Sequence, residues 1–166
     1  MCRKRAGGIS LKIGVISDTH MQNNYIKKAL VLLKDCDFII HLGDNIGDAR
    51  EIAKYFSKTI ISVKGNCDYA ENTPSEKIEI IGNKKIFITH GHNYNVKATL
   101  INLKYKAMEV GADIVLFGHT HVATTLFEEG IWFINPGSAG MARNGKNSVA
   151  IIEITDKNII PSIKLI

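Results

Sequence analysis

Five short apolar runs rich in isoleucine and valine most constrain how this chain can fold. They are LKIGVIS (11–17), DFIIHL (37–42), TIISVK (59–64), KIFITH (85–90) and DIVLFG (113–118). Runs of this length and composition are typical of buried β-strands. Between and after them, apolar residues recur with helical spacing over 25–34, 47–56 and about 95–109. The alternation of strands and helices predicts an α/β fold with a mainly parallel sheet.

The C-terminal part of the chain has a different pattern. Residues 122–138, VATTLFEEGIWFINPGS, predict two strands around a Glu-Glu-Gly turn. Residues 148–155 and 159–166 predict another hairpin, with Asp156-Lys157-Asn158 at the turn. We expect these strands to form a second, mostly antiparallel or mixed sheet that packs on the first. A plain doubly wound sheet is the alternative.

The length of the chain, 166 residues, favours a single domain. We expect residues 1–10, MCRKRAGGIS, to be a disordered leader, and residues 11–166 to form the domain. No apolar run approaches the roughly 20 residues that span a membrane, and no apolar signal core follows the basic start. The sequence therefore predicts a cytoplasmic protein without a membrane partner.

The cysteines and the net charge argue against several kinds of site. Cys2, Cys36 and Cys67 are odd in number and unrelated in spacing, which disfavours a disulfide framework or a thiolate zinc site. The formal charge is +5, but the basic residues are scattered, apart from the cluster Arg3-Lys4-Arg5. A nucleic-acid channel needs a basic stripe with interleaved aromatic residues, so nucleic acid is not the expected partner.

Side chains that can bind metals follow each of the five apolar runs. The chain has six histidines, and all of them lie at or within a few residues of the predicted strand ends. In open α/β sheets, ligand sites form at the carboxyl ends of the strands, so we expect these side chains to converge at one edge. The groups that we expect to meet there are Asp18, His20, Asp44, Asn66, His90, His119 and His121.

Seven such ligands indicate the type of metal centre. Imidazole, carboxylate and amide ligands without a thiolate favour Mn, Ni, Zn, Fe or Co, whereas calcium avoids imidazole. Seven ligands exceed one tetrahedral centre and suit two divalent ions that share a carboxylate. Two ions about 3.5–4 Å apart can hold a bridging hydroxide and clamp a phosphoryl group, so the hydroxide can attack phosphorus. Aminopeptidase-like chemistry is an alternative, although those sites are usually richer in carboxylates.

The polar segments also resemble the ordered motifs of calcineurin-like metallophosphoesterases, and most closely those of the small prokaryotic phosphodiesterase subgroup. The motifs are Asp18-Thr19-His20, Gly43-Asp44, Gly65-Asn66-Cys67-Asp68, Thr89-His90-Gly91-His92 and Gly118-His119-Thr120-His121, and Asn135-Pro136-Gly137-Ser138 extends the resemblance. The resemblance implies an α/β fold in the form of a four-layer α/β/β/α sandwich, with two mixed sheets flanked by helices.

The resemblance also implies roles for single residues. Asp18, His20 and His121 would hold the first metal, Asp44 would bridge, and Asn66, His90 and His119 would hold the second. His92 has no ligand role in the family, and we expect it to face phosphate or to support a ligand, so Asp44, Asn66 and His92 form the predicted catalytic set. Two residues stay open: His41 supports a ligand or packs in the core, and Asn45 is a turn residue or a phosphate contact.

Cys67 departs from the pattern of the superfamily. Most members carry a histidine directly after the asparagine of the third motif, where it is often assigned as the acid that protonates the leaving group. The small prokaryotic subgroup looks similar to this chain in that respect. Our hypothesis is that leaving-group protonation is weak here, or that His92 or metal-bound water supplies it; a general acid typically contributes about 10²–10⁴-fold.

The sequence thus predicts a metal-dependent phosphodiesterase that acts on small phosphodiesters such as cyclic nucleotides. A phosphomonoesterase and a nuclease are alternatives, although nucleases of this family usually carry extra domains. A non-catalytic metal-binding scaffold is a further alternative, because a eukaryotic trafficking subunit has this fold with degraded metal motifs. The resemblance also suggests a homodimer or homotetramer.

Overall fold

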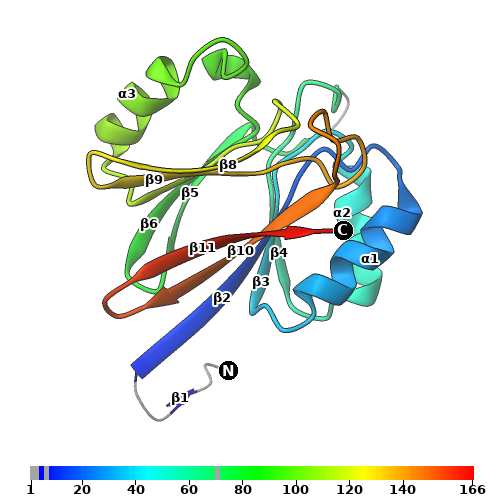
Figure 1. Cartoon of the computed structure of the whole chain (residues 1–166), viewed down its shortest axis with the longest axis horizontal. Helices are drawn as coiled ribbons and strands as arrows, with labels where there is room; N and C mark the ends of the chain where they lie inside the picture. Colours follow the sequence, from blue (N-terminus) through cyan, green and yellow to red (C-terminus); the bar gives the residue numbers. More distant parts are fainter. Residues whose placement is uncertain (1–3, 6–7, 70–71) are drawn as a thin grey trace.

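Two mixed β-sheets form the centre of the molecule, and helices cover their outer faces (Figure 1). The computed structural model describes residues 4–5, 8–69 and 72–166. Its elements are β1 (Lys4–Arg5), β2 (Gly8–Ile16), α1 (Asn23–Leu33), β3 (Phe38–His41), α2 (Gly47–Tyr55), β4 (Thr59–Ser62), β5 (Glu76–Ile81), β6 (Lys84–Thr89), the 3-10 helix η1 (His92–Tyr94), α3 (Ile101–Val110), β7 (Ile114–Leu116), β8 (Ala123–Glu128), β9 (Ile131–Pro136), β10 (Ser148–Thr155) and β11 (Ile159–Leu165).

Each sheet combines three parallel strands with antiparallel strands at one or both margins. The first sheet has the strand order β11-β10-β2-β3-β4, with β1 beside β2. Its strands β2, β3 and β4 are parallel, and β10 and β11 are antiparallel additions. The second sheet has the order β5-β6-β7-β9-β8, in which β6, β7 and β9 are parallel. Both sheets are therefore mixed, as predicted.

Three apolar layers hold the sheets and helices together. Isoleucines from both sheets, among them Ile40 and Ile86, fill the space between the sheets. Leu33 of α1 and Ile52 of α2 pack on the outer face of the first sheet. Leu103 of α3 packs on the outer face of the second sheet. These layers make a four-layer α/β/β/α sandwich, which confirms the predicted fold class.

The predicted assignment of strands to sheets was wrong in two places. The run at 85–90 and the run at 113–118 became β6 and β7, which belong to the second sheet rather than extending the first. The hairpin β10–β11 was expected in the second sheet but joins the first, because β10 pairs with β2 in the register Ile152↔Ile13. That register places Ile152 in the core between the sheets, so burial of its apolar face decides the placement.

Smaller differences concern the ends of elements. Strand β5 was not predicted, although Gly82 and Asn83, both with positive φ, form a turn typical of a tight hairpin between β5 and β6. The third helix begins at Ile101 instead of near residue 95. Within the predicted leader, β1 pairs with the start of β2. Strand β2, which was predicted to begin at residue 11, therefore begins at Gly8. The rest of that leader, residues 1–3 and 6–7, lies outside the described residues.

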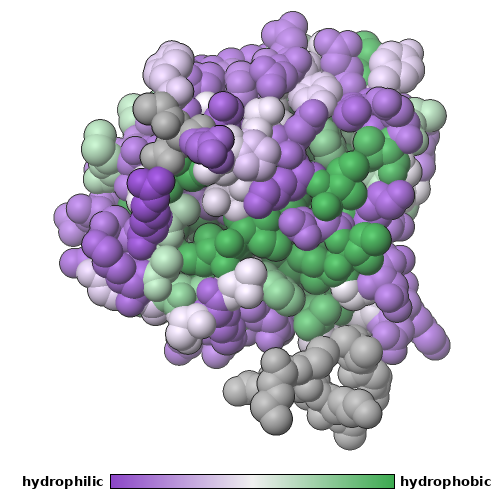
Figure 2. All heavy atoms as spheres, turned by 180° about the vertical axis from the view of Figure 1, so that it is seen from behind, coloured by the Kyte–Doolittle hydropathy of each residue, from purple (hydrophilic) through white to green (hydrophobic). Residues whose placement is uncertain are grey.

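The surface has one side with a concentration of apolar side chains. Figure 2 faces the side opposite to Figure 1 and shows a continuous apolar band across its middle, bordered by hydrophilic residues. Among the described residues, no helix is both long and apolar enough to cross a membrane.

Candidate metal centre

The loops that follow the central strands have an unusual backbone. Non-glycine residues rarely adopt positive φ, and a residue held there stores roughly 1–3 kcal/mol of strain. Five of the seven predicted ligands nevertheless have φ between 45° and 67°: Asp18, His20, Asp44, His119 and His121. Such strain persists only where surrounding contacts over-determine the conformation, and it concentrates at functional sites.

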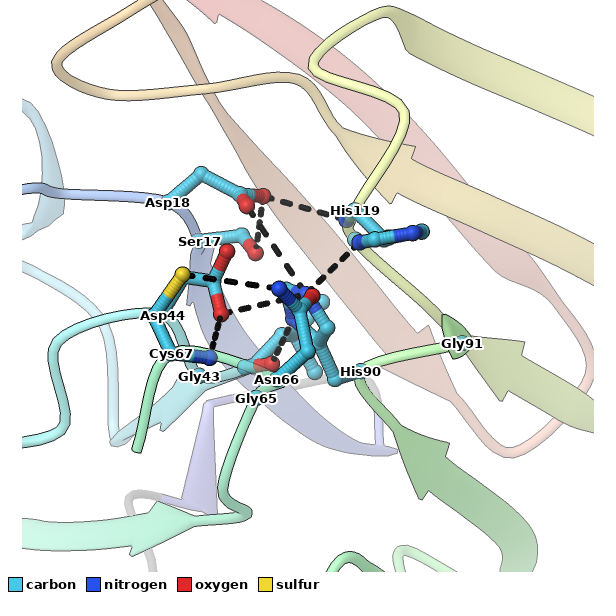
Figure 3. Close-up of polar contacts among 12 residues, drawn as sticks. Ser17, Asp18, Gly43, Asp44, Gly65, Asn66, Cys67, His90, Gly91 and His119 are labelled. Atoms are coloured by element: carbon cyan, nitrogen blue, oxygen red, sulfur yellow. Dashed lines mark hydrogen bonds and ion pairs between the residues drawn. The ribbon is translucent and has the colours of Figure 1, made fainter. Parts of the chain in front are cut away.

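The predicted ligands come together in two groups that share one residue. Atoms of Asp18, His20, Asp44 and His121 that can bind a metal lie within 4.8 Å of one another, and the corresponding atoms of Asp44, His90 and His119 do so as well. Figure 3 shows Asp44, Asn66, His90 and His119 pointing toward a common centre. This division is the one that the resemblance implied, with Asp44 as the shared carboxylate.

Two histidines are oriented by main-chain carbonyls. Nδ1 of His90 lies 2.7 Å from the carbonyl oxygen of Leu42, and Nδ1 of His121 lies 2.7 Å from that of Met141. A carbonyl only accepts, so each Nδ1 carries a proton, and each ring in its neutral form presents a lone pair at Nε2. This arrangement commonly fixes the tautomer of a metal-binding histidine.

The lone pairs of these rings face carboxylate oxygens. Nε2 of His121 lies 3.2 Å from Oδ1 of Asp18, and Nε2 of His90 lies 3.4 Å from Oδ1 of Asp44. The same His90 nitrogen lies 3.2 Å from Nδ1 of His119. Groups that can only accept would repel one another at such distances, unless a ring is protonated or a cation lies between them. The donor set therefore fits divalent ions.

Buried polar atoms without a partner support the same fit. Among the described residues, Oδ1 of Asp18, Nε2 of His20 and Oδ1 of Asn66 are buried and have no hydrogen-bond partner. Buried polar atoms almost always have a partner, because an unsatisfied one costs roughly 1–3 kcal/mol. All three atoms belong to predicted ligands, and a metal ion would satisfy them.

Burial and neighbouring groups shift the pKa values of the ionisable side chains in the site. Burial alone would raise the pKa of the Asp18 carboxyl, but its contacts with His121, His90 and Ser17 lower that pKa overall. The nearby Asp18 carboxylate is the main cause that raises the pKa of His121, because it favours a proton on the facing ring nitrogen. Burial lowers the pKa of His119 to about 4, so this ring is neutral at pH 7 and can act as a ligand.

Comparisons with known proteins assign this geometry to a family. The family model of the calcineurin-like phosphoesterase superfamily domain matches residues 11–157. The chain belongs to the calcineurin-like phosphoesterase superfamily. This finding confirms the resemblance of the motifs.

Similar proteins cover most of the chain. The probable metallophosphoesterase YsnB of Bacillus subtilis (strain 168) is 37% identical over 134 residues, which cover 80% of this chain and 78% of YsnB. Phosphodiesterase MJ0936 of Methanocaldococcus jannaschii is 30% identical, over 89% of this chain and 95% of its own. Vacuolar protein sorting-associated protein 29 of Schizosaccharomyces pombe is 31% identical, over 91% and 81%. The solved structure of a predicted phosphoesterase from Streptococcus pneumoniae TIGR4 matches with a TM-score of 0.80 and 29% identity, over 94% and 90%.

Asp68 organises the loops of the candidate metal centre, although sequence reasoning gave it no role. Its buried carboxylate accepts hydrogen bonds from four backbone N–H groups at 2.8–3.0 Å, those of Asp44, Asn45, Ile46 and Gly65. These donors come from the loops after β3 and β4, so Asp68 ties the loop of Asp44 to the loop of Asn66. The Gly-Asn-Cys-Asp motif contained this signal, but the partners were visible only in three dimensions.

Gly65 allows these two loops to approach each other. A Cβ atom at position 65 would lie 2.2 Å from Oδ1 of Asp44 and 2.5 Å from its backbone nitrogen. Both distances are far below van der Waals contact, so a side chain at Gly65 would displace the shared carboxylate.

The Asn135-Pro136-Gly137-Ser138 segment braces the site from the other side. Nδ2 of Asn135 donates to the carbonyl of Gly118 at 2.9 Å, and Oγ of Ser138 donates to the carbonyl of Asp18 at 2.8 Å. Gly118 precedes the ligands after β7 in the second sheet, whereas Asp18 follows β2 in the first. The segment therefore links the ligand loops of both sheets.

His41 supports the loops and is not in either ligand group. The N–H of Gly43 donates to Nδ1 of His41, so Nε2–H donates to Oγ1 of Thr19 at 3.2 Å. The ring is fully buried, and burial lowers its pKa to about 4. Of the two readings left open for His41, the structure favours support of the ligand loops after β2 and β3.

Three further predicted residues surround the ligands. His92 lies on η1, with its ring centroid 5.4 Å from that of His90, and its Nδ1 is buried without a partner among the described residues. Asn45 has a φ of 76° and its N–H bonds to Asp68, as a turn residue does. Cys67 is exposed, and its backbone N–H donates to Oδ1 of Asp44 at 3.0 Å.

Proposed function

We propose that this chain is a dinuclear metal-dependent phosphodiesterase that hydrolyses small phosphodiesters. The observation that carries the proposal is the pair of ligand groups with Asp44 in both. Asn66 completes the second group, because its unpartnered Oδ1 is buried beside it. The donor set suits two ions of Mn, Ni, Zn, Fe or Co. A relative named as a phosphodiesterase, MJ0936, supports the reaction class.

The protein residues orient and neutralise the reacting groups. Two divalent ions, when bound, supply positive charge that activates water and polarises the phosphoryl group. The N–H of Cys67 holds the Asp44 carboxylate in place from one side, and Asp68 fixes the backbone of Asp44 from the other. His92 lies beside His90 and His119 without being in either group, and we assign it to contact with a non-bridging phosphate oxygen.

Positive side chains near the centre favour an anionic substrate. Burial is the main cause that lowers the pKa values of His92 and His119, and the nearby charges of Lys64 and Lys97, respectively, lower them further. The charge of Arg143 also acts to lower the pKa of His121, although Asp18 raises that pKa overall. The backbone N–H of Arg143 donates to the carbonyl of His121 at 3.2 Å. These cations come from three different loops, so they would attract a phosphate from several sides.

Hydrolysis of chromogenic esters tests the proposal. Metal-stripped protein is reloaded with Mn, Ni, Zn, Fe or Co, with Mg as a comparison, and assayed on bis-p-nitrophenyl phosphate beside p-nitrophenyl phosphate. We expect metal-dependent turnover that favours the diester and stops on chelation. Preference for the monoester would replace the proposal by a phosphomonoesterase. Turnover of single-stranded oligonucleotides above that of small diesters would replace it by a nuclease.

A non-catalytic scaffold is the second candidate function. It is favoured by the 31% identity with vacuolar protein sorting-associated protein 29 of Schizosaccharomyces pombe. Against it stands the donor set, because the six predicted carboxylate and histidine ligands lie in two close groups that share Asp44. Two metal ions bound per chain without turnover of any ester would establish the scaffold.

We also propose a cytoplasmic location. Among the described residues, Cys36 and Cys67 are both free thiols, which fits a reducing compartment. Fractionation of the source cells, with detection by antibody, checks this assignment.

A further inference from the structure

Strand β5 is a margin of the second sheet with one free side. It pairs with β6 over all six of its residues, and in the described part of the chain no strand pairs with its other side. A free edge presents unpaired N–H and C=O groups, to which another strand can add. Natural edges are usually blunted by proline, by short length, by bulges or by charged side chains that point inward. Strand β5, which reads EKIEII, has only the charges, and these repel a second strand in some registers and attract it in others.

The two faces of β5 carry different side chains. Ile78 lies opposite Phe87, which packs under α3, so Ile78 and Ile80 are on the outer face of the sheet. Both are exposed, at 50% and 72% of their surface. Lys77 and Glu79 lie opposite isoleucines of the core between the sheets, so they are on the inner face. Both are half-buried, and neither forms an ion pair with another described residue.

The charges on the inner face of β5 can complement those of a second copy related by two-fold symmetry. When two copies of one strand pair antiparallel in a single sheet, directly opposed residues must lie on the same face. The two-fold axis therefore passes midway between one residue and the same residue of the other copy, and the register is named after that central residue. An axis through Ile78 places Lys77 of each copy opposite Glu79 of the other. An axis through Lys77 would oppose two lysines, and one through Glu79 would oppose two glutamates. Like charges directly opposite each other are destabilising, so only one of these registers is favourable.

We propose that two copies of this chain associate through β5 in the register centred on Ile78. The second sheets of the two copies then form one continuous ten-stranded sheet, because each contributes five strands. Two Lys77–Glu79 pairs form on the inner face, and the exposed isoleucines of both copies meet on the outer face. This pairing also covers exposed apolar surface on two residues that are otherwise open to solvent.

The other sheet margins lack this combination. Strand β8 exposes Leu126 and Phe127, but Glu128 is the one charged residue within the strand, so no register opposes complementary charges. Strand β11 contains Pro161, which has no N–H to donate. Strand β4 has only four residues. The charge pattern therefore selects β5 and a second copy as its occupant.

The proposed interface is connected to the metal centre. The carboxylate of Glu76, at the start of β5, accepts a hydrogen bond from Tyr94 at 2.5 Å. Tyr94 is the last residue of η1, and His92 is the first. Pairing of β5 would therefore hold the element that carries His92.

Sedimentation velocity over a range of protein concentrations tests the proposal through charge exchange. Wild-type chain is expected to dimerise. Lys77→Glu alone and Glu79→Lys alone should each weaken dimerisation by roughly 10- to 100-fold, because both attractive pairs become repulsive. The double variant Lys77→Glu/Glu79→Lys should dimerise as the wild type does. Lys157→Glu, in the exposed turn between β10 and β11, makes the same change of charge and should leave dimerisation unaltered.

Mixing the two single variants gives the sharpest result. A chain with two glutamates at 77 and 79 complements a chain with two lysines there, so the mixture should form a heterodimer although each variant alone is mainly monomeric. Heterodimer formation also proves that both variants are folded. Wild type that stays monomeric at every concentration overturns the proposal. So does a dimer that the single exchanges leave intact, or a mixture that does not associate.

Discussion

The two sheets contribute different chemistry to the metal centre. Loops after β2, β3 and β4 of the first sheet supply both carboxylates, Asp18 and Asp44, together with the imidazole of His20 and the amide of Asn66. Loops after β6 and β7 of the second sheet supply only imidazoles. The carboxylates are held by N–H and O–H donors such as Ser17. Two imidazoles of the second sheet are held by main-chain carbonyls, His90 by that of Leu42 and His121 by that of Met141.

This difference indicates what a metal ion does for the fold. The first sheet brings negative charge to the junction, and the second brings lone pairs, so neither set can satisfy the other by itself. Divalent ions attract both sets and would join the ends of the two sheets. We therefore expect metal binding to stabilise the sandwich as well as to supply catalysis, because a ligand that binds only the native state raises its stability.

The largest effect is expected from Asp44→Asn, which changes the one residue present in both ligand groups. We expect kcat/KM for bis-p-nitrophenyl phosphate to fall by roughly 10³-fold, a loss typical of removing a principal electrostatic group. Metal bound per chain, measured by mass spectrometry, should fall as well, and added Mn should no longer raise the melting temperature. Asp156→Asn, in an exposed turn, removes the same charge and serves as the control. Full activity of Asp44→Asn would remove the basis for a shared carboxylate.

The next effect concerns the support of the first-sheet loops by Asp68. Asp68→Ala leaves four N–H groups, three of them in buried hydrogen bonds, without their acceptor, so we expect a loss of about 3 kcal/mol in the free energy of unfolding. Activity should fall about tenfold at saturating metal, because the loops of Asp44 and Asn66 lose their common anchor. Urea unfolding and steady-state kinetics measure the two effects. Asp68→Asn should recover part of the stability, since its amide retains one oxygen acceptor. Unchanged stability of Asp68→Ala would show that water replaces the carboxylate.

Asp68 also shows where sequence reasoning reached its limit. Each predicted ligand directly follows an apolar strand, so its position could be read locally, and the structure gathers these residues as expected. The partners of Asp68 lie on two loops that meet only after β3 and β4 pair. Strand β5 was missed because Lys77 and Glu79 interrupt the apolar pattern at a sheet margin. The place of β10 depended on a register with β2, more than a hundred residues earlier in the chain.

A smaller effect follows from His41, which supports the first-sheet loops from within. Its pKa is about 4 in the folded state and 6.5 ordinarily, so the unfolded chain binds more protons between these values. The contribution of His41 to stability is complete above pH 6.5 and falls as the pH approaches 4, by about 3 kcal/mol in total. His41→Gln cannot titrate, so its unfolding free energy should decline less over this range. Parallel pH profiles of the two proteins would contradict the assignment.

The smallest effect is expected at Cys67, because its backbone contacts a predicted ligand whereas its side chain is exposed. The contact with Asp44 is made by the N–H of Cys67, which every replacement except proline retains. The thiol itself is exposed and lies 3.4 Å from Nδ2 of Asn66, a long contact, so we expect it to contribute little to the site. Cys67→Ser should therefore change kcat/KM by no more than about threefold, as surface substitutions do.

The position of Cys67 also bears on how the leaving group departs. If no side chain there protonates the leaving oxygen, the rate should fall steeply as the pKa of the leaving alcohol rises across a series of aryl and alkyl phosphodiesters. Cys67→His would place an imidazole at the same exposed position, beside Asn66 of the first sheet, and should reduce that slope. The measurement is the slope of log kcat/KM against leaving-group pKa for both proteins. A shallow slope already in the wild type would mean that a donor other than residue 67 operates, and His92, from the second sheet, would be the first residue to replace.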